Sequence, residues 1–133
     1  MQTEVAISKG RVWSGRILSV LAVLFFVMDG AMKLAKPPFV VKATLQLGYP
    51  ESTIVGIGAV LLAATLLYVV PRTAVLGAIL LTGYLGGAVA ANVRAATPLF
   101  NIVFPIVFAS MVWGGLWLRD PRLERLLPLT SKA

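Results

Sequence analysis

Four apolar stretches, each close to 20 residues long, constrain this chain more than any other feature of its sequence. They cover residues 16–35, 53–70, 73–93 and 99–118. An α-helix needs about 20 apolar residues to cross the hydrocarbon core of a bilayer. None of the stretches shows the period-two alternation of a transmembrane β-strand. The sequence therefore predicts an all-α, membrane-embedded bundle of four transmembrane helices, forming a single domain over residues 1–133.

The composition agrees with a membrane location. Of the 133 residues, 59% are hydrophobic and only 13% are charged, and the mean hydropathy is +0.91. A typical soluble domain has about 25% charged residues and at most about half apolar residues. The first stretch also has the charged flank of a signal peptide, but Asp29 and Lys33 stand where a small-residue cleavage site is needed. We therefore expect all four stretches to be membrane spans.

Basic residues are distributed unequally between the two ends of the predicted bundle. With four spans, both termini lie on one side of the membrane. That side carries Lys9, Arg11, Arg16, Arg72, Arg119, Arg122, Arg125 and Lys132. The opposite side carries Lys33, Lys36, Lys42 and Arg94. Cytoplasmic loops are enriched in lysine and arginine. The ratio of eight basic residues to four therefore predicts a multi-pass protein of the cell membrane with both termini in the cytoplasm.

The net charge of +7 is thus interpreted as a topology signal and as an attraction to anionic lipids of the bilayer. Binding of nucleic acid is not expected, because it requires a basic patch with exposed aromatic residues on a soluble surface.

The one long connection, residues 36–52, joins the first two spans. Its apolar positions from Phe39 to Leu47 predict a short interfacial helix on the outer membrane surface. The following Gly48-Tyr49-Pro50 is a turn signal that separates this helix from the second span.

A glycine-rich segment, "LLTGYLGGAVAANVR" at residues 80–94, lies in the third span. Gly83 and Gly87 have the GxxxG spacing, and Gly86 falls on the neighbouring stripe of the helix. Small residues let two helices approach closely in lipid, so we expect these glycines to pack against the second or fourth span of the same chain. The alternative is the seam of a homodimer. A phosphate-binding loop is excluded, since no strand precedes the segment.

The chain contains no cysteine and no histidine. A dithiol centre, an iron–sulfur cluster and a zinc–thiolate site within this chain are therefore excluded. Bis-histidine haem and the usual general base are missing as well. No metal site and no catalytic constellation is expected, which leaves open whether the protein takes part in catalysis. Redox chemistry would require a cofactor held without metal ligation, such as a quinone, or a redox partner subunit.

Polar side chains at the outer ends of the first and third spans are the candidate site. Asp29 and Lys33 are spaced i, i+4 and can pair on one helix face. Either they neutralise each other while Lys33 reaches the interface, or Asp29 joins Asn92 and Arg94 in a ligand site, with Tyr84 hydrogen-bonding inside the bundle. Ionisable groups at membrane depth are costly and point to function. Two bases against one acid favour an anionic or carbonyl-bearing ligand, such as a quinone oxygen or a lipid phosphate.

Several segments carry a resemblance to a known family. "SGRILSVLAVLFFVMDGAMKL", "LGYP", "TLLYVVPRTAVLGAILLTGYLGGAVAANVR" and "PLF" resemble the DoxX-like family of small four-helix membrane proteins. The resemblance runs from about Ser14 to Trp117. It implies the fold and the membrane location more firmly than a reaction. Members take their name from a subunit of a thiosulfate:quinone oxidoreductase, and most have no assigned activity.

Two positions depart from the family pattern. Members commonly carry a glutamate where this chain has Leu61 and a histidine where it has Asn92. If that pair performs proton or ligand chemistry in relatives, this chain has lost it. The matches at Asp29, Lys33, Tyr84 and Arg94 are retained.

Three classes of function follow from these observations. The first is an accessory membrane subunit of a quinone-linked redox system. The second is a structural or lipid-interacting membrane protein. The third is a small-solute transporter, which ranks last because four-helix exporters carry a glutamate in the middle of the first span, whereas here the charge lies at the helix end.

Overall fold

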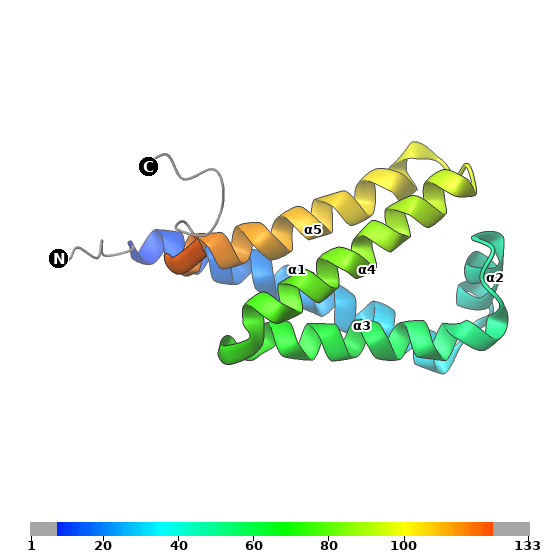
Figure 1. Cartoon of the computed structure of the whole chain (residues 1–133), viewed down its shortest axis with the longest axis horizontal. Coiled ribbons are helices and arrows are strands. Elements are labelled where there is room, and N and C mark those ends of the chain that lie inside the picture. Colours follow the sequence, from blue (N-terminus) through cyan, green and yellow to red (C-terminus); the bar gives the residue numbers. More distant parts are fainter. Residues whose placement is uncertain (1–7, 124–133) are drawn as a thin grey trace.

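The computed structural model describes residues 8–123, and these form helices joined by short turns (Figure 1). The elements are α1 (Lys9–Ala35), α2 (Pro38–Gln46), α3 (Ile54–Val69), α4 (Ala74–Arg94) and α5 (Leu99–Arg119), with one-turn 3-10 helices at Glu51–Thr53 and Pro71–Thr73. Helices α1, α3, α4 and α5 correspond to the four predicted spans, and α2 is the predicted short helix between the first two. The all-α prediction is confirmed.

Local signals explain where α1 begins and ends. The Ser8 side chain accepts a hydrogen bond from the Arg11 backbone N–H, which caps the helix start. The helix therefore begins seven residues before the predicted boundary at Arg16. It ends at Ala35, because the capping residue Lys36 has a left-handed φ of 58°. Pro37-Pro38 then fixes the start of α2.

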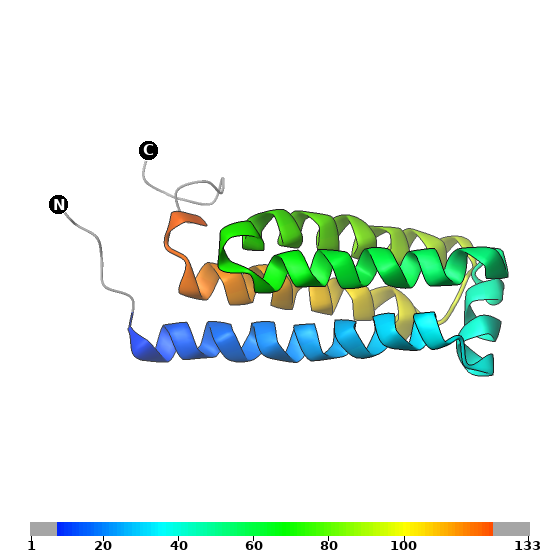
Figure 2. The ribbon, with the colours of Figure 1, turned by 90° about the horizontal axis from the view of Figure 1, so that it is seen from below.

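The four long helices form an antiparallel bundle in which α1 packs against α3 and α5, and α4 also packs against α3 and α5. Both ends of the described chain lie at one end of the bundle, and α2 lies across the other end (Figure 2). Each of the four is long and apolar enough to cross a membrane. The chain is therefore a multi-pass membrane protein.

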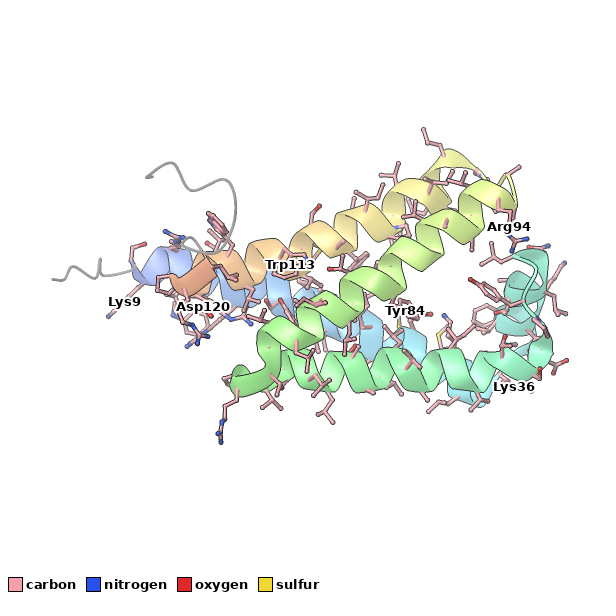
Figure 3. The ribbon with its side chains drawn as sticks, viewed as in Figure 1. Lys9, Lys36, Tyr84, Arg94, Trp113 and Asp120 are labelled. Carbon is pink, nitrogen blue, oxygen red and sulfur yellow. The ribbon has the colours of Figure 1, made fainter. Side chains whose placement is uncertain are left out.

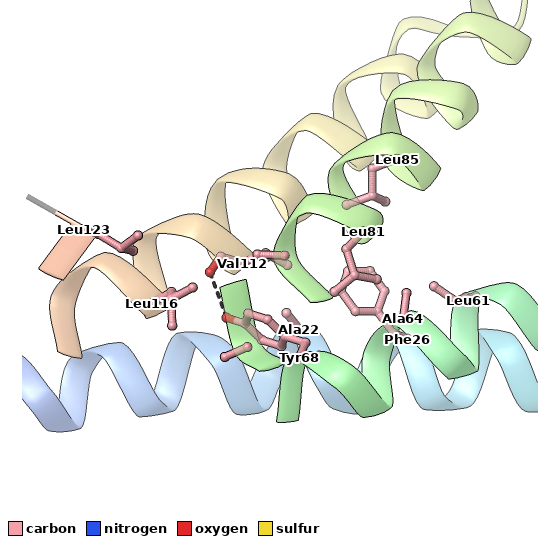
Figure 4. Packing of buried hydrophobic residues seen from close by; sticks show 12 residues of the cluster. Ala22, Phe26, Leu61, Ala64, Tyr68, Leu81, Leu85, Val112, Leu116 and Leu123 are labelled. Atoms are coloured by element: carbon pink, nitrogen blue, oxygen red, sulfur yellow. Dashed lines mark hydrogen bonds between the residues drawn. The ribbon is translucent and has the colours of Figure 1, made fainter. Parts of the chain in front are cut away.

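The bundle interior is built from a few large side chains. Phe26, Leu61, Tyr68, Leu81 and Val112 are almost completely buried where the helices meet (Figure 4). The outward surface of the bundle is apolar like its interior, and Leu24, Val60 and Leu66 are more than half exposed. Exposing such a surface to water is energetically unfavourable, whereas contact with lipid is not. The exposed apolar surface therefore supports the membrane assignment.

Close approach of the helices depends on glycines other than the predicted ones. A Cβ added at Gly115 of α5 would lie 2.9 Å from the Gly15 carbonyl oxygen of α1. A Cβ added at Gly58 of α3 would lie 3.0 Å from the Gly30 carbonyl oxygen of α1. These two pairs mark the points where α1 crosses its neighbours, because only a missing side chain leaves room for backbone contact.

The expectation that Gly83, Gly86 and Gly87 pack against another helix of the same chain is wrong. An added Cβ at any of them would meet no atom within 4 Å in the part of the chain that the structure describes, and all three are exposed. They lie on the outer side of α4. Their alternative role, the seam of a homodimer, stays a prediction.

The orientation of the bundle gives a first testable prediction. A reporter fused after Pro38 should be periplasmic, whereas reporters fused after Arg72 or at the C-terminus should be cytoplasmic, because basic residues concentrate at the end that holds the termini. Paired alkaline phosphatase and fluorescent-protein fusions would measure this. A periplasmic signal at the C-terminus would contradict it.

Candidate functional site

The Asp29–Lys33 pair lies near the end of α1 that α2 caps. Lys33 Nζ is 2.7 Å from Asp29 Oδ1, one helical turn away, and the two side chains are 18% and 28% exposed. The i, i+4 pairing predicted from the sequence is therefore formed. Partial burial strengthens the pair relative to a fully solvated one, since less water screens the two charges.

The pair is held in place by the α1–α3 crossing. Gly30 follows Asp29, and Gly58 of α3 lies so close that an added Cβ would be 2.7 Å from Lys33 Cβ. The side-chain stem of Lys33 therefore packs on the α3 backbone while its ammonium group turns to Asp29. The two glycines therefore allow the ion pair to lie close against α3.

Tyr84 brings α4 to the same neighbourhood. Its side chain is partly buried and points from α4 toward α1, and its hydroxyl lies within electrostatic range of Asp29 and Tyr49 (Figure 3). Within residues 8–123 this hydroxyl makes no hydrogen bond. A hydroxyl group left without a partner away from water costs about 1–3 kcal/mol. Tyr84 is thus a polar group that a ligand would satisfy.

Arg94 tethers the end of α4 to the turn after α2. Its Nη2 donates a hydrogen bond of 2.9 Å to the Leu47 carbonyl oxygen. The guanidinium group covers Gly48, whose φ of 93° demands glycine, and an added Cβ there would lie 3.0 Å from Arg94 Nη2. Tyr49 comes next in the chain. The turn therefore connects Arg94 to the neighbourhood of Tyr84 and Asp29.

Asn92 has a local role at the end of α4. Its Nδ2 donates to the Ala88 carbonyl oxygen at 2.8 Å, and its Oδ1 accepts from Thr97 Oγ1 at 2.9 Å. Leu61, the other position that departs from the family pattern, is fully buried in the core on α3. Leu61 thus has a packing role in the core, and Asn92 stabilises the turn that follows α4.

The predicted site is therefore assembled in part. Asp29 and Lys33 are paired, and Tyr84 lies near them. In the part of the chain described here, no hydrogen bond or ion pair links Asp29 to Arg94 or to Asn92. Nor does any group of three or more acidic residues in that part suit a metal ion. Within residues 8–123 the arrangement offers a phenol that makes no hydrogen bond, within electrostatic range of Asp29, which suits a hydrogen-bond acceptor.

A second polar cluster, which the sequence analysis missed, lies at the opposite end of the bundle. Tyr68 is 1% exposed and donates a hydrogen bond of 2.7 Å to the Val112 carbonyl oxygen. Ser19 Oγ lies 2.7 Å from the same hydroxyl group, and Arg119 donates to Ser19. The available signal was the presence of Ser19 and Tyr68 within otherwise apolar spans, because buried polar groups in membranes need partners.

Fold and site together define a small four-span membrane protein with a polar cluster near each end and no metal-binding group within residues 8–123. The chain belongs to the DoxX-like family, whose model matches residues 17–115. No curated protein and no solved structure matches the chain.

Proposed function

We propose that the protein is an accessory membrane subunit of a quinone-linked redox system, and that Tyr84 donates a hydrogen bond to a quinone carbonyl oxygen. The observation that carries this proposal is Tyr84, a partly buried residue of a membrane span whose hydroxyl makes no hydrogen bond within residues 8–123. A neutral phenol is a hydrogen-bond donor, and a desolvated donor gains most from an acceptor that brings its own apolar body.

A quinone fits the residues present. Its ring and tail are apolar, as is the bilayer from which it would enter, and its two carbonyl oxygens accept hydrogen bonds. Lys33 adds a positive charge and N–H donors beside Asp29. When bound, the quinone would supply the electron transfer that a chain without histidine and cysteine lacks.

A redox partner subunit follows from the same reasoning. The quinone needs an electron donor. This chain has no cysteine or histidine with which to hold a second redox centre. We expect a catalytic chain to co-purify with the protein from native membranes in mild detergent. A preparation containing only this chain would leave the second class, a structural or lipid-interacting protein, as the better description.

Exchange of tyrosine for phenylalanine tests the ligand role. Tyr84→Phe should weaken the binding of a short-chain ubiquinone analogue by about fivefold, because one hydrogen bond contributes about 1 kcal/mol. It should not lower the stability of the protein, since the hydroxyl makes no hydrogen bond within the described chain. Calorimetric titration of the purified protein in nanodiscs measures the affinity.

Tyr68→Phe is the matched control, because it removes the same atom at the other end of the bundle. It should lower stability, since the Tyr68 hydroxyl is hydrogen-bonded, but leave quinone affinity unchanged. The proposal fails if wild-type protein binds no quinone analogue, or if the two variants bind it equally well.

A further inference from the structure

The end of the bundle that holds both termini carries a large excess of positive charge. Its described ionisable side chains are Lys9, Arg11, Arg16, Arg72, Arg119, Arg122 and Asp120. The remaining terminal residues add two acids and two bases, so they do not reduce this excess. At the opposite end, each of the two acids is paired with a lysine. The excess of cations over acids is therefore larger at the terminal end.

Arg119 is a partly buried cation at this end that has no acidic partner among residues 8–123. It is partly buried where α1, α3 and α5 meet, donates to Ser19 Oγ, and has its Cζ 5.8 Å from the centroid of the Tyr68 ring. A guanidinium group has five N–H donors. Across residues 8–123 the hydrogen bond to Ser19 uses one of them, and no carboxylate lies within ion-pair distance of Arg119.

Within the described residues, the acid next to Arg119 in the sequence already has a partner. Asp120 Oδ2 accepts from Arg122 Nη2 at 2.7 Å, and Oδ1 accepts from Arg122 Nε at 3.0 Å. These hydrogen bonds lower the pKa of Asp120 below its ordinary value. The carboxylate thus stays ionised, but its lone pairs are directed at Arg122.

The carbonyl groups at the end of α5 are bonded by another cation. Arg11 of α1 donates to the carbonyl oxygens of Leu118 and Trp117, in the last turn of α5. A cation at this position compensates the negative end of the helix dipole. The remaining donors of Arg119 are therefore available to an external anion.

We infer that Arg119 binds the phosphate of an anionic phospholipid at this end of the bundle. A guanidinium group matches a phosphate through two parallel hydrogen bonds, and partial burial strengthens the attraction. The surrounding features are those of a headgroup region. Arg16 lies over the exposed Trp13 ring, 5.3 Å from its centroid, and tryptophan concentrates at membrane–water interfaces. The exposed apolar side chains farther along α1, such as Ile17, Val20 and Leu24, would contact the acyl chains.

Lipid-dependent thermal stability tests this inference, independently of the quinone site at the other end. In a neutral detergent, phosphatidylglycerol should raise the unfolding midpoint of the wild-type protein by about 4 °C more than phosphatidylcholine does, because binding to the folded state stabilises it. Arg119→Gln should lose most of that difference. Arg119→Lys should retain part of it, since lysine keeps the positive charge but cannot form the two parallel hydrogen bonds of a guanidinium group. Each variant is compared only with itself, so a lower starting stability does not affect the result.

Arg72→Gln is the matched control, since Arg72 is exposed at the same end of the bundle and makes no hydrogen bond, ion pair or ring contact within the described chain. It should retain the full difference between the two lipids. Equal effects of both lipids on the wild-type protein would overturn the inference, as would equal losses in the Arg72 and Arg119 variants, which would indicate diffuse surface charge. Glycerol phosphate at the same concentration should have no effect, and a shift as large as that of the lipid would show a site for free phosphate instead.

Discussion

Replacing Gly115 by leucine should lower the free energy of unfolding by about 3 kcal/mol, at the upper end of the usual cost of overpacking. At this position even a methyl group has no room. A Cβ would lie 2.9 Å from the Gly15 carbonyl oxygen and 3.1 Å from the Ser19 backbone nitrogen, both on α1. Because these are backbone atoms of a continuous helix, they cannot rotate away. The whole of α1 would have to move from α5.

Gly87→Leu is the matched control. Gly87 also lies within a membrane span, but an added Cβ there would meet nothing within 4 Å in the described structure. Its replacement should change stability by at most about 0.5 kcal/mol, as for a surface substitution. The midpoint of unfolding by sodium dodecyl sulfate in mixed micelles measures both variants. A Gly115 variant as stable as the wild type, or a Gly87 variant that is equally destabilised, would contradict the assigned helix contacts.

The Gly87 variant also tests the homodimer. If the outer stripe of α4 is a dimer seam, Gly87→Leu should shift the protein from dimer to monomer without lowering the stability of the monomer, because a large side chain separates the two helices. Light scattering of the detergent-solubilised protein measures the oligomeric state. A monomeric wild-type protein would leave Gly83, Gly86 and Gly87 facing lipid.

The spans were predictable because bilayer thickness sets their length, whereas the helix faces were not. In a soluble bundle, the contrast between apolar and polar faces shows which side of a helix is buried. Here the lipid-facing side is as apolar as the interior, so Leu66 and Leu61 look alike in the sequence although one is exposed and the other buried. Small residues were then the signal left for predicting which helix faces pack together. The densest stripe of them, at Gly83, Gly86 and Gly87, faces outward. The Gly15–Ser19 spacing in α1 was the better signal.

The candidate site was predictable to the extent that it is local. Asp29 and Lys33 pair within one helix, so their spacing was sufficient. The approach of Tyr84 to Asp29 joins two helices that are distant in sequence, and no spacing encodes it. Likewise, the partner of Arg94 is a backbone carbonyl oxygen in a turn, which any residue type would supply.

The buried tyrosine at the other end should produce the second large effect. Tyr68→Ala is expected to cost about 4 kcal/mol, because it removes a fully buried aromatic ring from the meeting point of α1, α3, α4 and α5 and leaves a cavity there. The ring also lies beneath the Arg119 guanidinium group. Unfolding in mixed micelles should detect the loss as an early transition.

Tyr68→Phe separates the hydroxyl group from the ring. The hydroxyl group donates to the Val112 carbonyl oxygen on α5 (Figure 4). It also accepts from Ser19 on α1, so it joins α3 to both helices. Its removal should cost about 1–2 kcal/mol, the price of a buried hydrogen bond whose partner is left unsatisfied. In a background of Ser19→Ala, the same exchange should cost less, because part of the network is already absent. Additive costs would show that Ser19 and Tyr68 act separately, and that the polar connection across α1, α3 and α5 contributes nothing as a unit.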